Sequence, residues 1–249
     1  MVDTHCHLDS CRVPDAELIE RAREAGITRL ATVGMNSASI ARALQAAAEH
    51  DEVFAIVGCH PHEAEGFSDE DLEEIERAAA NPLALAVGET GLDHYRDHAP
   101  RADQRRAFKA QLALAGRAAL PVVVHTREAE EDTFAMLAEH AADTTVVLHC
   151  FSAPDRVQEC VDRGYLCSFA GNLTYPSAEP LREAARALPD ELVMVETDSP
   201  YLAPVPLRGK PNEPANVIHT AQLLAELRGT DIESLNALVE ENAARVFRW

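Results

Sequence analysis

Residues 121–150 read PVVVHTREAEEDTFAMLAEHAADTTVVLHC. Two apolar, β-branched runs, Val122–His125 and Thr145–His149, flank the stretch Glu128–His140, whose apolar residues recur at three- and four-residue spacing. That spacing is typical of an amphipathic helix, and continuous apolar runs are typical of strands in a parallel sheet covered by helices. The stretch therefore predicts a strand, a helix and a second, parallel strand, and each strand ends in a histidine.

The same alternation extends over the whole chain. The predicted strands are Val2–His5, Arg29–Val33, Val53–Val57, Leu83–Val87, Val122–His125, Thr145–His149, Leu166–Phe169 and Leu192–Glu196. The predicted helices are Asp15–Ala25, Ser39–Glu49, Asp69–Ala79, Asp103–Ala118, Glu128–His140, Asp155–Arg163, Pro180–Ala187, Asn216–Arg228 and Ile232–Val246, with Asp231 as the N-cap of the last. This order predicts an α/β fold, a (β/α)8 TIM barrel, with residues 1–249 as one domain. An open doubly wound sheet is the alternative, but no strand is followed by its Gly-x-Gly-x-x-Gly pattern.

The composition is that of an acidic globular protein. The chain has 42 Asp and Glu against 22 Lys and Arg, which gives a net charge of −20. Such a charge disfavours extended contact with phosphate backbones. The six cysteines include no Cys-x-x-Cys pair, so we expect free thiols in the cytoplasm. No apolar run is long enough to span a membrane, and no obligate protein partner is evident.

Metal-binding side chains stand at the carboxyl ends of the predicted strands, where a barrel of this kind builds its active site. In chain order they are His5, His7, His60, His62, Glu89, His125, His149, Glu196 and Asp198. Side chains alternate along a strand, so His5 and His7 point to one face and can grip one ion. Imidazole with carboxylate suits zinc, manganese, iron or nickel better than calcium.

Six of these residues form the predicted metal site: His5, His7, Glu89, His125, His149 and Asp198. Two ions need a bridging anion, and since no strand ends in a lysine, Glu89 is the expected bridge. His5, His7 and Asp198 would complete the coordination of one ion, and His125 and His149 would complete that of the other. Asp198 is also the expected general base toward a metal-activated water, so the catalytic pair is Asp198 and Glu89.

Four further residues are candidates for substrate binding. His60 and His62 could contact a phosphate or a leaving group, although a structural role in their loop is equally compatible with the sequence. Arg208 and Lys210 lie in the long loop after the last strand. In a chain so poor in cations, two of them next to the predicted site favour an anionic substrate.

Five ordered motifs stand at or beside the strand ends: DTHCHL (3–8), GCHPH (58–62), GETGLD (88–93), HCFS (149–152) and ETDSPYL (196–202). Together with NAARVF (242–247) they resemble the TatD family of metal-dependent deoxyribonucleases over essentially the whole chain. The resemblance implies an amidohydrolase-type barrel, two divalent ions (Mg, Mn or Zn) and hydrolysis of DNA phosphodiester bonds, often from the 3′ end. It implies metal roles for the same six residues. His94 and Pro211 depart from the family pattern, which leaves substrate preference open.

Three classes of function are compatible with these features. The first is a 3′–5′ exonuclease that takes only the end of a DNA strand, or another small anionic substrate, into a metal pocket and so needs no basic stripe. The second is a hydrolase of another bond at the same site, such as a D-aminoacyl-tRNA deacylase or a lactone or amide hydrolase. The third is a scaffold protein that has lost the chemistry, and the presence of all six predicted ligands argues against it. We expect the nuclease.

Overall fold

The computed structural model describes all 249 residues, and its eight strands form one sheet in the order β1 to β8. The strands are β1 (Val2–Cys6), β2 (Arg29–Gly34), β3 (Val53–Val57), β4 (Ala84–Asp93), β5 (Val122–Arg127), β6 (Val146–Leu148), β7 (Leu166–Phe169) and β8 (Val193–Val195). The helices are α1 (Asp15–Glu24), α2 (Ser37–Glu49), α3 (Asp69–Ala79), α4 (Arg101–Ala118), α5 (Glu130–His140), α6 (Val157–Arg163), α7 (Glu179–Ala187), α8 (Val217–Arg228) and α9 (Ile232–Phe247). The chain forms two compact units.

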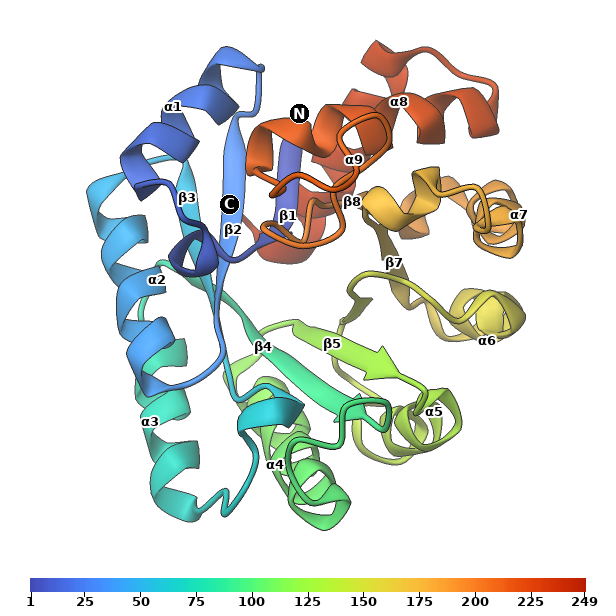
Figure 1. Ribbon diagram of the computed structural model, residues 1–249. Coiled ribbons are helices and arrows are strands. Elements are labelled where there is room, and N and C mark those ends of the chain that lie inside the picture. The colour runs from blue at the N-terminus through green and yellow to red at the C-terminus, as the bar shows by residue number, and fades with distance from the viewer. The chain divides into compact units, whose positions relative to one another are not determined.

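The first unit combines residues Met1–Thr32 with His149–Trp249. Its strands β1 and β2 pair in parallel, as do β7 and β8. β8 also lies beside β1, because the Asp198 amide donates to the His5 carbonyl at 2.9 Å. Helix α9 packs against β1 and β8, and α8 packs against α7 and α9 (Figure 1). A last strand beside the first is what the predicted (β/α)8 barrel requires and what an open doubly wound sheet lacks.

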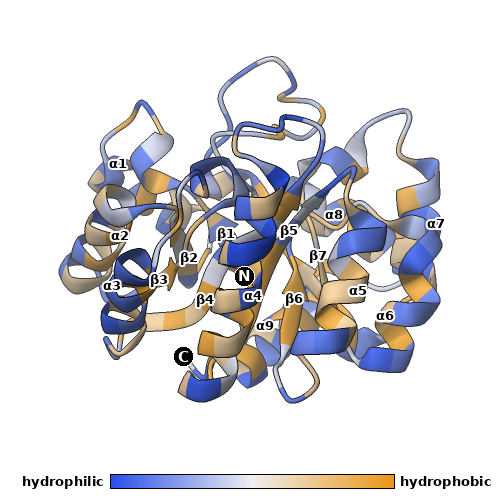
Figure 2. Cartoon of the chain, turned by 90° about the horizontal axis from the view of Figure 1, so that it is seen from below, coloured by the Kyte–Doolittle hydropathy of each residue, from blue (hydrophilic) through white to orange (hydrophobic).

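The second unit comprises residues Val33–Leu148. Strands β3 to β6 pair in parallel, α2 packs against β3, and α4 packs against β4. Phe108 and Leu112 of α4 and Phe134 of α5 are fully buried, and each contributes about 1.5–3 kcal/mol by leaving water. The strands and helices differ in hydropathy. Strands such as β5 and β6 are hydrophobic, while the helices carry many hydrophilic residues (Figure 2).

Side-chain caps fix where several helices begin. The Asn36 side chain accepts a hydrogen bond from the Ser39 amide, and the Ser39 hydroxyl accepts one from the Asn36 amide. With this cap, α2 begins at Ser37, two residues before the predicted start. Asp231 accepts from the Ser234 amide at 2.7 Å, which confirms it as the N-cap of α9. None of the nine helices has both the length and the hydrophobicity that crossing a bilayer requires.

Strand β4 is longer than the sequence predicted. The apolar run indicated an end at Val87 with Glu89 beyond it, but the strand continues to Asp93 and Glu89 lies inside it. That prediction was wrong because residues 88–91, Gly-Glu-Thr-Gly, contain no β-branched apolar residue that would indicate a strand. Pairing with β5 holds these residues in the extended conformation despite their low β propensity. Gly91 is required there: its φ is 146°, and a Cβ would lie 1.9 Å from the His125 carbonyl oxygen.

Candidate metal centre

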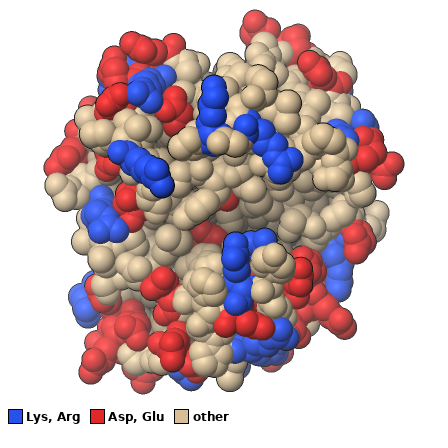
Figure 3. Space-filling model, in the orientation of Figure 1, with Lys and Arg blue, Asp and Glu red and all other residues tan.

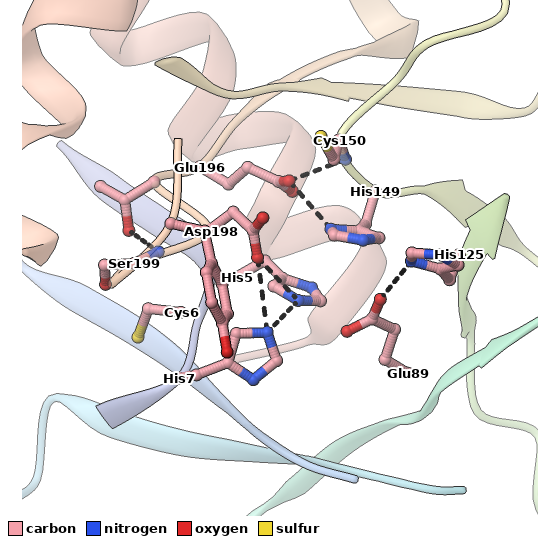
Figure 4. Close-up of polar contacts among 12 residues, drawn as sticks. His5, Cys6, His7, Glu89, His125, His149, Cys150, Glu196, Asp198 and Ser199 are labelled. Carbon is pink, nitrogen blue, oxygen red and sulfur yellow. Dashed lines mark hydrogen bonds and ion pairs between the residues drawn. The ribbon is translucent and has the colours of Figure 1, made fainter. Parts of the chain in front are cut away.

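A group of buried histidines and carboxylates lies at the strand ends of the first unit. Its members, called here the first cluster, are His5, His7, His149, Glu196 and Asp198 (Figure 4). His5 belongs to β1 and His7 follows it directly, His149 follows β6, and the two acids follow β8. Parallel strands end at the same edge, so residues far apart in the chain meet there.

Three ligand atoms of the first cluster converge on one point. The Nε2 atoms of His5 and His7 are 3.3 Å apart, and Asp198 Oδ1 lies 3.4 Å from the His7 atom and 3.9 Å from the His5 atom. Ligands about 2.1 Å from a tetrahedral ion stand about 3.4 Å from one another. Two imidazoles and a carboxylate with these spacings fit a divalent transition-metal ion.

His149 is held by a carboxylate that the predicted ligand set did not include. Its Nδ1 atom is 3.0 Å from Glu196 Oε1, and the same oxygen accepts from the Cys150 amide at 2.7 Å. The His149 ring stacks on that of His5, with centroids 3.9 Å apart. A carboxylate on one nitrogen of a histidine fixes the orientation of the ring and leaves its other nitrogen for a ligand.

Backbone contacts hold Asp198 in an unusual conformation. Its φ is 53°, which is uncommon outside glycine and costs on the order of 1–3 kcal/mol. The Asp198 amide donates to the His5 carbonyl at 2.9 Å, and the Tyr201 amide donates to the Asp198 carbonyl at 2.9 Å. Burial acts to raise the pKa of Asp198, but the neighbouring histidines, His7 first, hold it below its ordinary value. The side chain is therefore a carboxylate at neutral pH.

Beneath the first cluster, Asp3 joins β1 to the segment after β8. It accepts from the Thr197 amide at 2.9 Å and from the Thr197 hydroxyl at 2.5 Å. Burial is the main cause that raises the pKa of Asp3 to about 8. The pair fixes the backbone immediately before Asp198.

The second unit contains a similar group, called here the second cluster: His60, His62, Glu89, Asp93 and His125. Glu89 Oε1 lies 2.8 Å from His125 Nδ1 and 3.3 Å from His60 Nε2. Asp93 Oδ2 lies 2.8 Å from His62 Nε2 and 3.3 Å from His125 Nε2. The two carboxylates and three imidazoles thus form one continuous polar network, and its His60–Glu89–His125 part has the ligand types and spacing of a metal site.

The electrostatics of the second cluster favour neutral imidazole at His60 and an ionised Asp93. Burial lowers the pKa of His60 to about 4, against the opposing effect of Glu89. Burial acts to raise the pKa of Asp93, but hydrogen bonds from His125, from the Arg96 backbone and from His62 hold it well below the usual range. Neutral imidazole nitrogen is the form that binds a metal.

The loop after β8 carries the predicted substrate-binding cations. Arg208 lies over the ring of Tyr175, 4.0 Å from its centroid, and Lys210 is exposed. Buried Asn212 fixes the loop, because its side-chain amide donates to the Thr197 carbonyl at 3.0 Å and to the Tyr201 carbonyl at 2.8 Å. Neither cation forms a hydrogen bond or ion pair with the first cluster, and their substrate role stays a prediction.

The structure brings together His5, His7, His149 and Asp198 in one unit, and His60, His62, Glu89 and His125 in the other. Sequence reasoning counted Glu196 among the possible metal ligands but left it out of the predicted site, and it gave no role to Asp93 or Asn212. Asp93 could have been found, since it lies four residues after Glu89 and alternation places both on one face of a strand. Nothing in the sequence signals the partners of Asn212, which are backbone carbonyls.

Comparisons with known proteins decide the family. A family model described as TatD related DNase matches residues 2–248. The chain belongs to this family. The uncharacterized metal-dependent hydrolase TatD of Mycobacterium tuberculosis is 41% identical over 260 residues, covering 99% of this chain and 97% of the relative. The 3'-5' ssDNA/RNA exonuclease TatD of Erwinia amylovora is 36% identical, covering 93% of this chain and 92% of the relative.

A solved structure agrees with the family assignment. The crystal structure of YJJV, a TatD homolog from Escherichia coli, matches with a TM-score of 0.93 at 30% identity, covering 100% of this chain and 98% of that one. The predicted barrel and the predicted TatD-type metal-dependent hydrolase are thereby confirmed.

Proposed function

We propose that this TatD-family protein is a 3′–5′ exodeoxyribonuclease that cleaves phosphodiester bonds with two divalent ions. The observation that carries the proposal is the convergence of the His5 and His7 Nε2 atoms with Asp198 Oδ1, at separations of 3.3 to 3.9 Å. That spacing suits ligands of one ion. The exonuclease name of the Erwinia relative gives the bond and the polarity.

Each cluster would contribute ligands to the metal centre. His5, His7 and Asp198 would hold one ion, while His125 and His149 would serve the other, with Glu89 as the anionic bridge. Divalent ions, Mg, Mn or Zn, would lower the pKa of a bound water and neutralise charge on the phosphate oxygens. The ligand roles, the number of ions and the bridge are parts of the proposal.

The protein's own side chains would move the proton and hold the substrate. Asp198 is a carboxylate at neutral pH and would accept the proton of the attacking water. Glu89, whose Oε1 lies 2.8 Å from His125 and 3.3 Å from His60, would be the carboxylate shared by the metals. His60 and His62, with Arg208 and Lys210, are the proposed contacts to the phosphates of the substrate.

The charge of the chain restricts how a nucleic acid would bind. On the face drawn in Figure 3, lysines and arginines form separate groups among acidic side chains rather than a continuous basic band. Long-range attraction of a polyanion is weak for such a surface. The proposed substrate is therefore the end of a DNA strand, in the cytoplasm, which suits six cysteines that are all free.

The test is hydrolysis of a single-stranded oligonucleotide labelled at its 5′ end, with EDTA, Mg²⁺, Mn²⁺ or Zn²⁺. The variant is Asp198→Asn, and Asp162→Asn on the exposed side of α6 is the charge-matched control. We expect a metal-dependent ladder that shortens from the 3′ end in the parent and the control, and at least a hundredfold slower cleavage in Asp198→Asn.

Intact oligonucleotide with every metal would reject the nuclease. The same protein samples would then be assayed on D-aminoacyl-tRNA and on lactones, which the same site chemistry can hydrolyse. Loss of an activity of that kind in Asp198→Asn would assign the site to the other bond.

A further inference from the structure

Tyr95, just after β4, is an exposed aromatic ring flanked by arginines. Its exposed fraction is 52%, the Arg127 guanidinium lies 4.1 Å from the ring centroid, and that of Arg96 lies 5.5 Å away. Neither guanidinium forms a salt bridge, whereas Arg101 and Arg106 of the same unit pair with aspartates. A cation–π contact contributes about 0.5–1 kcal/mol at an exposed site, and here it leaves about half of the surface of Tyr95 accessible to a ligand.

Asp93 ties this ring to the second cluster. Its Oδ1 accepts from the Tyr95 amide at 2.9 Å, while its Oδ2 lies 2.8 Å from His62 and 3.3 Å from His125. Arg127 follows His125 by two residues on β5, so both side chains leave the strand on the same face. The backbone that carries the ring is therefore held next to the second cluster, and Arg127 lies beside the ring.

We infer that Tyr95 and Arg127 form a binding site for single-stranded nucleic acid, in which an unpaired base stacks on the ring and a phosphate pairs with the guanidinium. The inference rests on the proposed function and assigns residues that bind its substrate. Aromatic rings stack on any base, and guanidinium binds phosphate through paired hydrogen bonds. Stacking would contribute affinity for nucleic acid, which the net charge of −20 opposes.

The site makes single strands the preferred substrate over duplexes. In a duplex both faces of a base are covered by its neighbours, so a tyrosine ring gains a stacking partner only after the base leaves the helix. A frayed or single-stranded 3′ end offers such a base without this cost.

Binding is measured by fluorescence anisotropy of a labelled oligodeoxyadenylate, with all variants built on Asp198→Asn so that the strand stays intact. We expect Tyr95→Ala to weaken binding roughly 5- to 150-fold and Tyr95→Phe to bind as the parent does. A strand of abasic nucleotides has no base to stack on the ring, so it should bind the parent and Tyr95→Ala with the same low affinity. Arg77→Gln, an exposed charge on α3, is the control for loss of one cation and should leave affinity unchanged.

Arg127→Gln separates phosphate binding from stacking. Removing one phosphate contact should reduce the slope of log affinity against log salt concentration by about 0.7, while Tyr95→Ala should leave that slope unchanged. Parental affinity in Tyr95→Ala on the Asp198→Asn background, together with nuclease activity in the unsubstituted protein, would overturn the binding site and leave the proposed function standing. Loss of affinity in Tyr95→Ala, in a protein whose unsubstituted form cleaves no nucleic acid, would support the binding site and reject the proposed function.

Discussion

Replacing Glu196 by glutamine should weaken metal binding without disturbing the fold. Glu196 is fully buried and is not one of the proposed substrate-binding residues. Its Oε1 atom lies 3.0 Å from His149 Nδ1 and accepts a hydrogen bond from the Cys150 amide at 2.7 Å. Glutamine has the same shape and can place its carbonyl oxygen at that position. The substitution therefore removes the negative charge and keeps both hydrogen bonds.

The size of the effect follows from those two bonds. A hydrogen bond to a charged group contributes about 1.5–3 kcal/mol and a neutral one about 1 kcal/mol. Losing the charge should cost about 1–2 kcal/mol of support for His149 as a ligand, which is roughly a 5- to 30-fold loss of metal affinity. Glu196→Ala removes both bonds as well and should lose about 100-fold.

The assay is titration of the metal-free protein with Mn²⁺ or Zn²⁺ by calorimetry, with far-ultraviolet circular dichroism as the check on folding. Glu226→Gln, an exposed acid on α8, is the matched control and should bind metal as the parent does. Metal affinity within about twofold of the parent in a folded Glu196→Gln protein would show that the carboxylate does not act through His149, and the reasoning would be wrong.

Three further predictions concern the fold that carries the site. Asp231→Ala should lower the free energy of unfolding in urea by about 1 kcal/mol, because it removes the cap of α9, while Asp231→Asn should cost little. Gly91→Ala should cost about 3 kcal/mol or more and impair metal binding, because the new Cβ would displace the His125 backbone; an unchanged melting temperature would contradict this. If the 249 residues form one domain as predicted, Trp249 fluorescence and circular dichroism should report a single coincident unfolding transition.

Much of the fold was predictable because the periodicity of apolar residues is local. All eight strands and nine helices were found from it, and most errors are of one or two residues at element ends. The exception is β4, whose second half reads Gly-Glu-Thr-Gly-Leu-Asp and shows no strand signal. Its conformation depends on pairing with β5, which lies about 30 residues further along the chain.

The sequence by itself determined the kind of site: alternation set His5 and His7 on one face, and the strand-end positions indicated the other candidate ligands. Only the tertiary structure decided which side chains support them. Glu196 meets His149 across 47 positions of sequence, and Asp93 joins His62 to His125 across 31 and 32 positions. Such contacts are set by strand order and by the register of paired strands, and no local pattern of residues encodes those.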